Sequence, residues 1–153
     1  APFDQSDSDV VLRSSTGVNF FAHKVILRMA SPFFETMLSL PQSAAASSIN
    51  SEDFVDGLPC IRMSEDTQTL HRLLTFIYPV SLSMPKTVKE SLLLLSAFQK
   101  YQLDDRMAVL RRLLASEKSC VIDKFNAVEV FGLAHQHRLV EEALRAARVS
   151  LKV

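Results

Sequence analysis

Glycine is scarce in this chain of 153 residues. Only Gly17, Gly57 and Gly132 are present, whereas average usage would give roughly 11. Loops that bind phosphate need closely spaced glycines, so that backbone N–H groups can approach the ligand. The three glycines here lie far apart, and no nucleotide-binding or nucleophile-elbow motif is present. The sequence therefore excludes a glycine-rich phosphate site.

Net charge and long apolar runs are also lacking. Seventeen basic residues balance seventeen acidic ones, so the formal charge is zero. Binding to nucleic acid is driven by a net basic surface, so we expect no direct nucleic-acid partner. The longest purely apolar run is Leu92–Leu95, far short of the ~20 residues that span a bilayer. We therefore expect no membrane association and assign the leucine run to the core.

Cysteines and histidines are few and poorly placed for chemistry. Cys60 and Cys120 have no C-x-x-C partner, and no glycosylation sequon or apolar leader is present. We therefore expect an intracellular protein, cytoplasmic or nuclear, with reduced thiols. His135 and His137 would point about 200° apart on a helix and could not hold one ion. Since no catalytic motif is present either, we predict no metal, no cofactor and no enzymatic activity.

Hydrophobic periodicity predicts an α+β fold, with a small three-stranded sheet followed by helices. The expected strands are 10–12, 18–21 and 59–63, and the expected helices are 23–29, 32–39, 66–77, 88–101, 104–117, 123–137 and 139–151. Ser31, followed by Pro32, and Asp66 are the expected N-caps. Residues 1–8 are polar and should be loose, and 41–57 should form a mobile loop.

The last two predicted helices should form an antiparallel pair. In the final helix one face carries Val140, Leu144, Ala147 and Leu151. Glu141 and Arg145 are four residues apart and should pair on a solvated face. Gly17 should lie in a hairpin turn, where a positive φ favours glycine. Gly132 lies inside a predicted helix, where we expect it to permit close helix packing.

Three motifs, taken together and in order, carry a resemblance to a known family. They are Asp9-Val10 with Phe20-x-Ala22-His23-Lys24-x-x-Leu27, then Ser31-Pro32-Phe33-Phe34-x-x-Met37-Leu38, then Ile61-x-Met63-x-Glu65-Asp66. This pattern resembles the BTB/POZ domain over residues 9–116. Asp56-Gly57-Leu58-Pro59 and Tyr78-Pro79 are similar to the expanded fungal set of that family. Residues 117–153 resemble a BACK-like helical extension packed on the core.

The resemblance implies a non-catalytic module whose partners are other proteins. Members of the family form homodimers, serve as adaptors for cullin ubiquitin ligases, recruit corepressors or build channel tetramers, and the fold does not choose among these roles. Strongly dimeric relatives carry a long N-terminal helix, but only eight residues precede Asp9 here. Self-association and cullin binding therefore both stay open.

The resemblance also implies where partners bind. Asp9 and Lys24 match residues that form a charged pocket near the dimer groove in the family; the alternative is that Lys24 is an ordinary surface charge. Apolar anchors are expected from Phe33, Phe34 and Met37 and, in the loop, from Ile49 and Phe54, with Glu52 as a polar contact. These loop residues only approximate the hydrophobic-x-Glu element of cullin adaptors. Ile49 to Glu52 is one residue too long, and Phe54-Val55-Asp56 has aspartate in place of glutamate.

Overall fold

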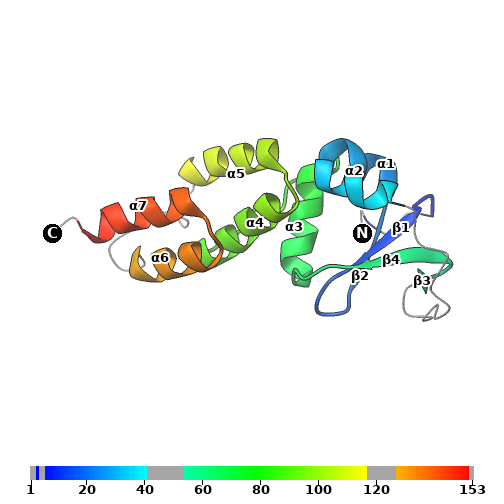
Figure 1. Cartoon of the computed structure of the whole chain (residues 1–153), viewed down its shortest axis with the longest axis horizontal. Helices are drawn as coiled ribbons and strands as arrows, with labels where there is room; N and C mark the ends of the chain where they lie inside the picture. The colour runs from blue at the N-terminus through cyan, green and yellow to red at the C-terminus, as the bar shows by residue number, and fades with distance from the viewer. Residues whose placement is uncertain (1–2, 4–5, 41–53, 117–126, 152–153) are drawn as a thin grey trace. The chain divides into compact units, whose positions relative to one another are not determined.

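The computed structural model describes residues 3, 6–40, 54–116 and 127–151 (Figure 1). Two predicted site residues, Ile49 and Glu52, lie outside these ranges, as do Cys120 and the first residues of the helix expected from 123. The chain divides into two compact units, residues 1–82 and 83–153.

A small mixed sheet forms the first part of the first unit. Its strands are β1 (Val10–Arg13), β2 (Asn19–Ala22), β3 (Phe54–Val55) and β4 (Leu58–Arg62), in the order β2-β1-β4-β3. Strand β1 is antiparallel to β2 and parallel to β4. The α+β class and the three expected strands are confirmed. The fourth strand, β3, has two residues, too few to give a periodic signal in the sequence.

Two tight turns use backbone conformations with positive φ. Gly17 has φ 88° between β1 and β2, as expected for a hairpin glycine. Between β3 and β4, Asp56 has φ 51° and Gly57 has φ 78°. Asp-Gly is a preferred pair for a two-residue hairpin turn in which both central residues have positive φ. Asp56 is therefore part of the turn that sets the pairing of Val55 with Leu58.

Three helices accompany the sheet: α1 (Lys24–Ala30), α2 (Pro32–Ser39) and α3 (Thr67–Ile77). Both predicted caps are present. Ser31 Oγ accepts a hydrogen bond from the Phe34 N–H at 3.2 Å, and Asp66 Oδ1 accepts one from the Thr69 N–H at 2.8 Å. Helix α3 buries its predicted stripe of Leu70, Leu73, Leu74 and Ile77. It ends just before Tyr78-Pro79, because the residue before proline disfavours helical geometry.

Helices alone form the second unit. They are α4 (Val88–Lys100), α5 (Asp104–Ser116), α6 (Ala127–Gln136) and α7 (Val140–Ser150). Helix α4 packs against both α5 and α6, and α6 and α7 lie side by side as the predicted antiparallel pair (Figure 1). Three of the four leucines in Leu92–Leu95 are buried, as expected for a core helix. Among the described residues, no helix is both long enough and apolar enough to span a membrane.

A partly buried ion pair joins α5 to α7. Arg111 donates from Nε to Glu142 Oε1 at 2.7 Å and from Nη2 to Oε2 at 3.0 Å, while its Nη1 lies 3.1 Å from Glu141 Oε2. The hydrogen bond to Glu142 raises the pKa of Arg111 above its ordinary value. The predicted Glu141–Arg145 pair is also present, at 3.7 Å, but both side chains are mostly exposed.

One expectation about helix packing is wrong. Gly132 is exposed, and a Cβ added at this position would meet no atom within 4 Å. It therefore does not serve close packing within the chain.

The apolar face of α7 does not point into the core. Val140, Leu144 and Leu151 are all more than half exposed, whereas Glu142 and Ala146 are buried.

We predict that Arg111→Ala destabilises the chain by about 2–3 kcal/mol, because it leaves the Glu142 carboxylate with little solvent and without its charged partner. Arg145→Ala is the matched control, since exposed pairs contribute about 0–1 kcal/mol. The free energy of unfolding in urea measures both. Equal unfolding midpoints for the two variants would contradict the prediction.

Candidate functional site

A chain of polar groups lies where β2 ends and α1 begins. The Tyr78 hydroxyl accepts a hydrogen bond from the His23 backbone N–H at 2.8 Å and lies 3.1 Å from His23 Nδ1. His23 Nε2 in turn lies 3.1 Å from Asp7 Oδ1. All three contacts are satisfied when the tyrosine hydroxyl donates to Nδ1 and Nε2–H donates to the carboxylate. The end of α3 is thereby tied to the start of α1.

Two groups of the Asp7–His23–Tyr78 chain have shifted pKa values, with different causes. The hydrogen bond from His23 lowers the pKa of the Asp7 carboxyl below its ordinary value of 3.8. Burial raises the pKa of the Tyr78 hydroxyl above its ordinary value of 10.0. The folded state therefore favours the neutral form of the Tyr78 hydroxyl. The stability that the neutral hydroxyl contributes to the fold is complete below pH 10 and is lost as the pH rises through the raised pKa.

The segment before β1 is held by a buried aromatic side chain. Phe3 packs edge-on against Phe20, His71 and Tyr78, with ring centroids 6.1, 5.7 and 5.3 Å apart. Its carbonyl accepts a hydrogen bond from the Phe21 N–H at 2.9 Å. The expectation that residues 1–8 are loose is therefore wrong for Phe3, which is only 4% exposed. A single aromatic residue in a polar segment carries no periodic signal from which its burial could be predicted.

The structure brings the predicted residues Asp9 and Lys24 together. Asp9 Oδ1 accepts a hydrogen bond from the Lys24 backbone N–H at 2.7 Å. His23, the N-cap of α1, has no side-chain capping bond of its own. Asp9 thus satisfies a free N–H at the start of α1 from outside the helix, which is a structural role. Their role as a partner-binding pocket stays a prediction.

The predicted anchors on α2 differ in exposure. Phe34 is fully buried, so it is a core residue and the expectation that it anchors a partner at the surface is wrong. Phe33 and Met37 are half-buried, and Phe33 packs edge-on against Phe34 at 5.7 Å between ring centroids. Consecutive helical residues point about 100° apart, so only one of the two phenylalanines can enter the core. Phe54, on β3, is exposed.

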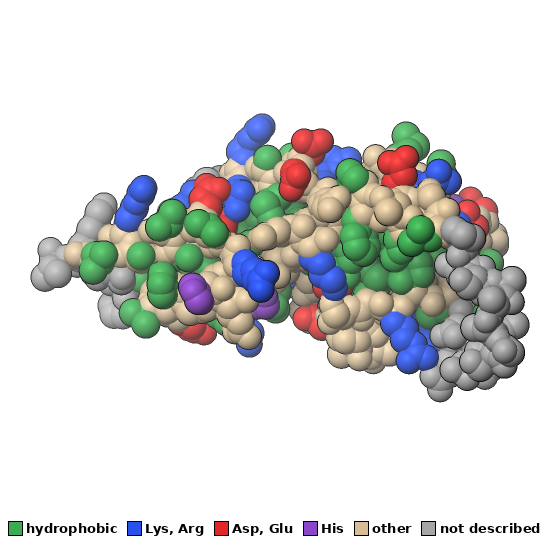
Figure 2. All heavy atoms as spheres, in the orientation of Figure 1, with side chains coloured by type: hydrophobic (Ala, Val, Ile, Leu, Met, Phe, Trp, Pro, Cys, Tyr) green, Lys and Arg blue, Asp and Glu red, His purple; other side chains and the backbone are tan. Residues whose placement is uncertain are grey.

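An apolar face on α1 escaped the sequence analysis. Val25 is 60% exposed and Met29 is 85% exposed, and the two lie one turn apart on the side of α1 away from the buried Leu27. Figure 2 shows hydrophobic side chains projecting outward beyond α1 and α2. The sequence alone could have indicated this face, because the short helix α1 has apolar residues on both of its sides. We call Val25 and Met29 the α1 face.

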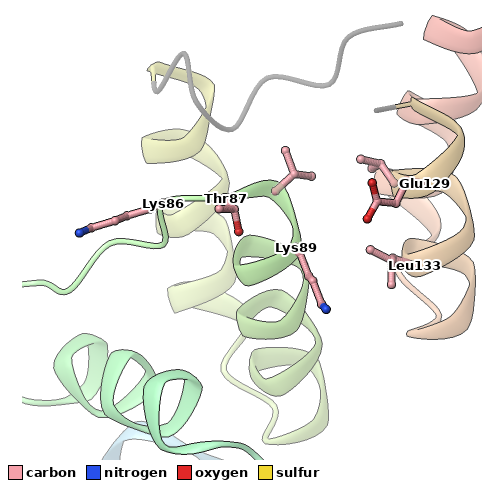
Figure 3. Close-up of a pocket in the computed structure, with 7 residues that line it drawn as sticks. Lys86, Thr87, Lys89, Glu129 and Leu133 are labelled. Carbon is pink, nitrogen blue, oxygen red and sulfur yellow. The ribbon is translucent and has the colours of Figure 1, made fainter. Parts of the chain in front are cut away.

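A shallow pocket of about 290 Å³ lies within the second unit, between the first turn of α4 and α6. Its lining includes Thr87, Lys89, Glu129 and Leu133 (Figure 3). Figure 3 shows the Lys86 side chain directed away from α6. The lining therefore offers one lysine and one glutamate and no convergent set of polar groups of the kind that orients a small ligand. Within the described ranges, no three His, Cys, Asp or Glu residues are grouped as a metal site would need.

Comparison with known proteins identifies the fold family. A model of the BTB/POZ domain matches residues 2–118, which is more than half of the chain. The chain belongs to the BTB/POZ family. Among solved structures it is similar to the BTB domain of zebrafish PATZ1, with 17% sequence identity and a TM-score of 0.52, over 72% of this chain and 77% of that one. A comparison with curated proteins finds no match.

BTB/POZ domains are, as a family, protein–protein interaction modules and typically non-catalytic. The match spans the sheet and α1–α5, so it includes the α1 face, the Asp7–His23–Tyr78 chain and the pocket for Phe3. The polar chain therefore braces the start of α1 against the end of α3. The exposed Val25 and Met29 lie on the helix that it holds.

We predict that Tyr78→Phe destabilises the chain by about 1–3 kcal/mol, because it leaves the His23 N–H in a half-buried site without an acceptor. The urea unfolding midpoint of the variant should fall. The loss of stability that the parent chain shows above pH 10 should be smaller in the variant. Gln68→Ala, an exposed change on the same helix, is the control and should shift stability by no more than about 0.5 kcal/mol. An unchanged midpoint for Tyr78→Phe would show that the brace contributes nothing.

Proposed function

We propose that this BTB/POZ chain acts as a scaffold or adaptor that binds other proteins through the α1 face. The observation that carries the proposal is the exposure of Val25 and Met29, one turn apart on a helix that is braced at its first turn. Large apolar side chains surrounded by polar ones are typical of the buried centre of an interface. Arg28, Glu35 and Thr36 are exposed on α1 and α2 and would supply the polar rim.

The α1 face suits a second copy of the chain as well as a different protein. Methionine adapts its shape to several partners, which favours an interaction module over a site for one rigid ligand. Asp9 and Lys24 lie at the start of the same helix, where they would contribute polar contacts. Homodimerisation is therefore one form of the proposal.

Other features of the proposal rest on the sequence. We assign residues 9–116 to the BTB/POZ core and 117–153 to a BACK-like extension; the end of the family match at residue 118 supports this division. Ile49, Glu52 and Phe54 would add partner-specific contacts. We further propose that the chain is related to the fungal members of the family. We also propose an intracellular location, cytoplasmic or nuclear.

The test of the α1 face is a double substitution, Val25→Glu with Met29→Glu. Because both side chains are exposed, the unfolding midpoint should stay the same, whereas association through this face should weaken at least tenfold. Sedimentation velocity at several concentrations measures self-association, and titration with a purified partner measures hetero-association. Val18→Glu, at an exposed apolar position in the β1–β2 turn, is the control and should bind like the parent chain. Unimpaired binding of the purified partner by the double variant would refute the α1 face.

Cullin binding is the alternative function, and corepressor recruitment the second alternative. The exposed Phe54 and the acidic Asp56 two residues later give a hydrophobic-x-acid element at β3, and this favours testing a cullin first. If the alternative holds, a purified cullin N-terminal domain should bind the chain, and Phe54→Ala should weaken that binding at least tenfold. No interaction at tens of micromolar would eliminate the cullin adaptor.

A further inference from the structure

The outward face of the α6–α7 pair carries a second group of exposed apolar side chains. They are Val128 and Phe131 on α6 and Val140, Leu144 and Leu151 at α7 and its C-cap. Figure 2 shows hydrophobic side chains on the viewer's side of both helices. Soluble monomers rarely leave a contiguous apolar patch uncovered unless it serves an interaction. This surface lies on different helices from the α1 face and has no part in the proposed function.

The spacing on α7 is that of a coiled-coil seam. Val140, Leu144, Ala147 and Leu151 follow one another at steps of four, three and four residues, which are the d-a-d-a positions of a heptad. Glu142 and Ala146, on the other side of the helix, are buried inside the unit. Helix α7 therefore uses one side to pack within its own unit and presents a second, regularly spaced apolar side outward. We call these four residues the α7 seam.

The charges beside the seam indicate what kind of helix fits it. Glu141 and Arg148 both occupy the e position of the heptad, carry opposite charges and are exposed. In an antiparallel pair of identical helices, the e position of one helix lies opposite the e position of the other, and ion pairs there set orientation and partner choice. Glu141 of each copy would then face Arg148 of the other, giving two attractive pairs.

A parallel arrangement lacks this complementarity. It would place the g position of one helix, Ala143, near the e position of the other, Arg148, and no opposite charges would meet. The α7 seam is thus complementary to itself in the antiparallel direction only. A surface that is complementary to itself about a two-fold axis is what a symmetric dimer interface requires.

We propose that a second copy of this chain docks antiparallel on the α7 seam, with Val128 and Phe131 of α6 widening the contact. Stable dimers bury about 800 Å² per partner, and a contact between two three-turn helices is smaller than that. The α6 side chains supply additional apolar area, and the resulting dimer should dissociate in the micromolar range. A chain with both this interface and the α1 face could link partners into a larger assembly.

The first experiment isolates the seam. Sedimentation equilibrium is measured on the full chain carrying Val25→Glu and Met29→Glu, so that the α1 face cannot contribute. We expect a concentration-dependent dimer with a micromolar Kd, and at least a tenfold weaker dimer when Leu144→Glu is added. Val109→Glu, at a less exposed apolar position on α5 of the same unit, is the control and should leave the Kd unchanged. Thermal unfolding of each variant establishes that the fold persists.

The second experiment tests the direction of pairing. Glu141→Arg and Arg148→Glu, made separately, should each weaken self-association, because like charges then meet across the interface. Mixing equal amounts of the two variants should restore the dimer, since each copy supplies the charge that the other lacks. Failure of the mixture to associate would overturn the antiparallel arrangement.

The outcomes separate this proposal from the proposed function. A chain that stays monomeric at hundreds of micromolar, or a Leu144→Glu variant that dimerises as before, overturns the seam even if the α1 face binds its partner. Conversely, dimerisation that survives the α1 substitutions and is lost with Leu144→Glu supports the seam whether or not the α1 face binds anything.

Discussion

The central strand β1 is the element on which the first unit depends. It pairs antiparallel with β2 on one side and parallel with β4 on the other, and its residues Val10, Val11 and Leu12 are completely buried. Parallel strands need a long crossover connection, and here the chain between β1 and β4 contains β2, α1, α2 and β3. The position of α1 is therefore determined twice, by the β1–β2–β4 pairing and by the Tyr78 hydroxyl that binds the His23 backbone. The exposed side chains of α1 gain a defined direction from this double constraint.

The secondary structure followed from the sequence wherever a local cause existed. The caps at Ser31 and Asp66, the end of α3 before Pro79 and the glycine turns all depend on neighbouring residues, and all are present. Features that depend on distant residues were missed. Phe3 is buried because Phe20, His71 and Tyr78 form a pocket for it, and Glu142 is buried because Arg111 lies across from it on α5. Neither partner is adjacent in the chain.

The candidate site was predictable only in part, for a related reason. Periodicity identified an apolar side of α2 but could not say that Phe34 rather than Phe33 enters the core. Likewise, Val140, Leu144 and Leu151 share a face by their spacing alone, yet the spacing does not tell an inward face from an outward one. The distinction comes from Glu142 and Ala146, which pack inside the unit and turn the leucines outward. Asp9 and Lys24 do lie close together, but the contact runs through the Lys24 backbone N–H and not through its charged side chain.

The hydrogen bond between Phe3 and Phe21 has a further effect on the sheet. Strand β2 is an outer strand, and such strands expose backbone groups that can pair with another polypeptide and start aggregation. The Phe3 carbonyl accepts the Phe21 N–H, and the Phe3 ring lies buried beside it. This N–H on the outer side of β2 is therefore already bonded within the chain, which makes the addition of another strand at this point less favourable.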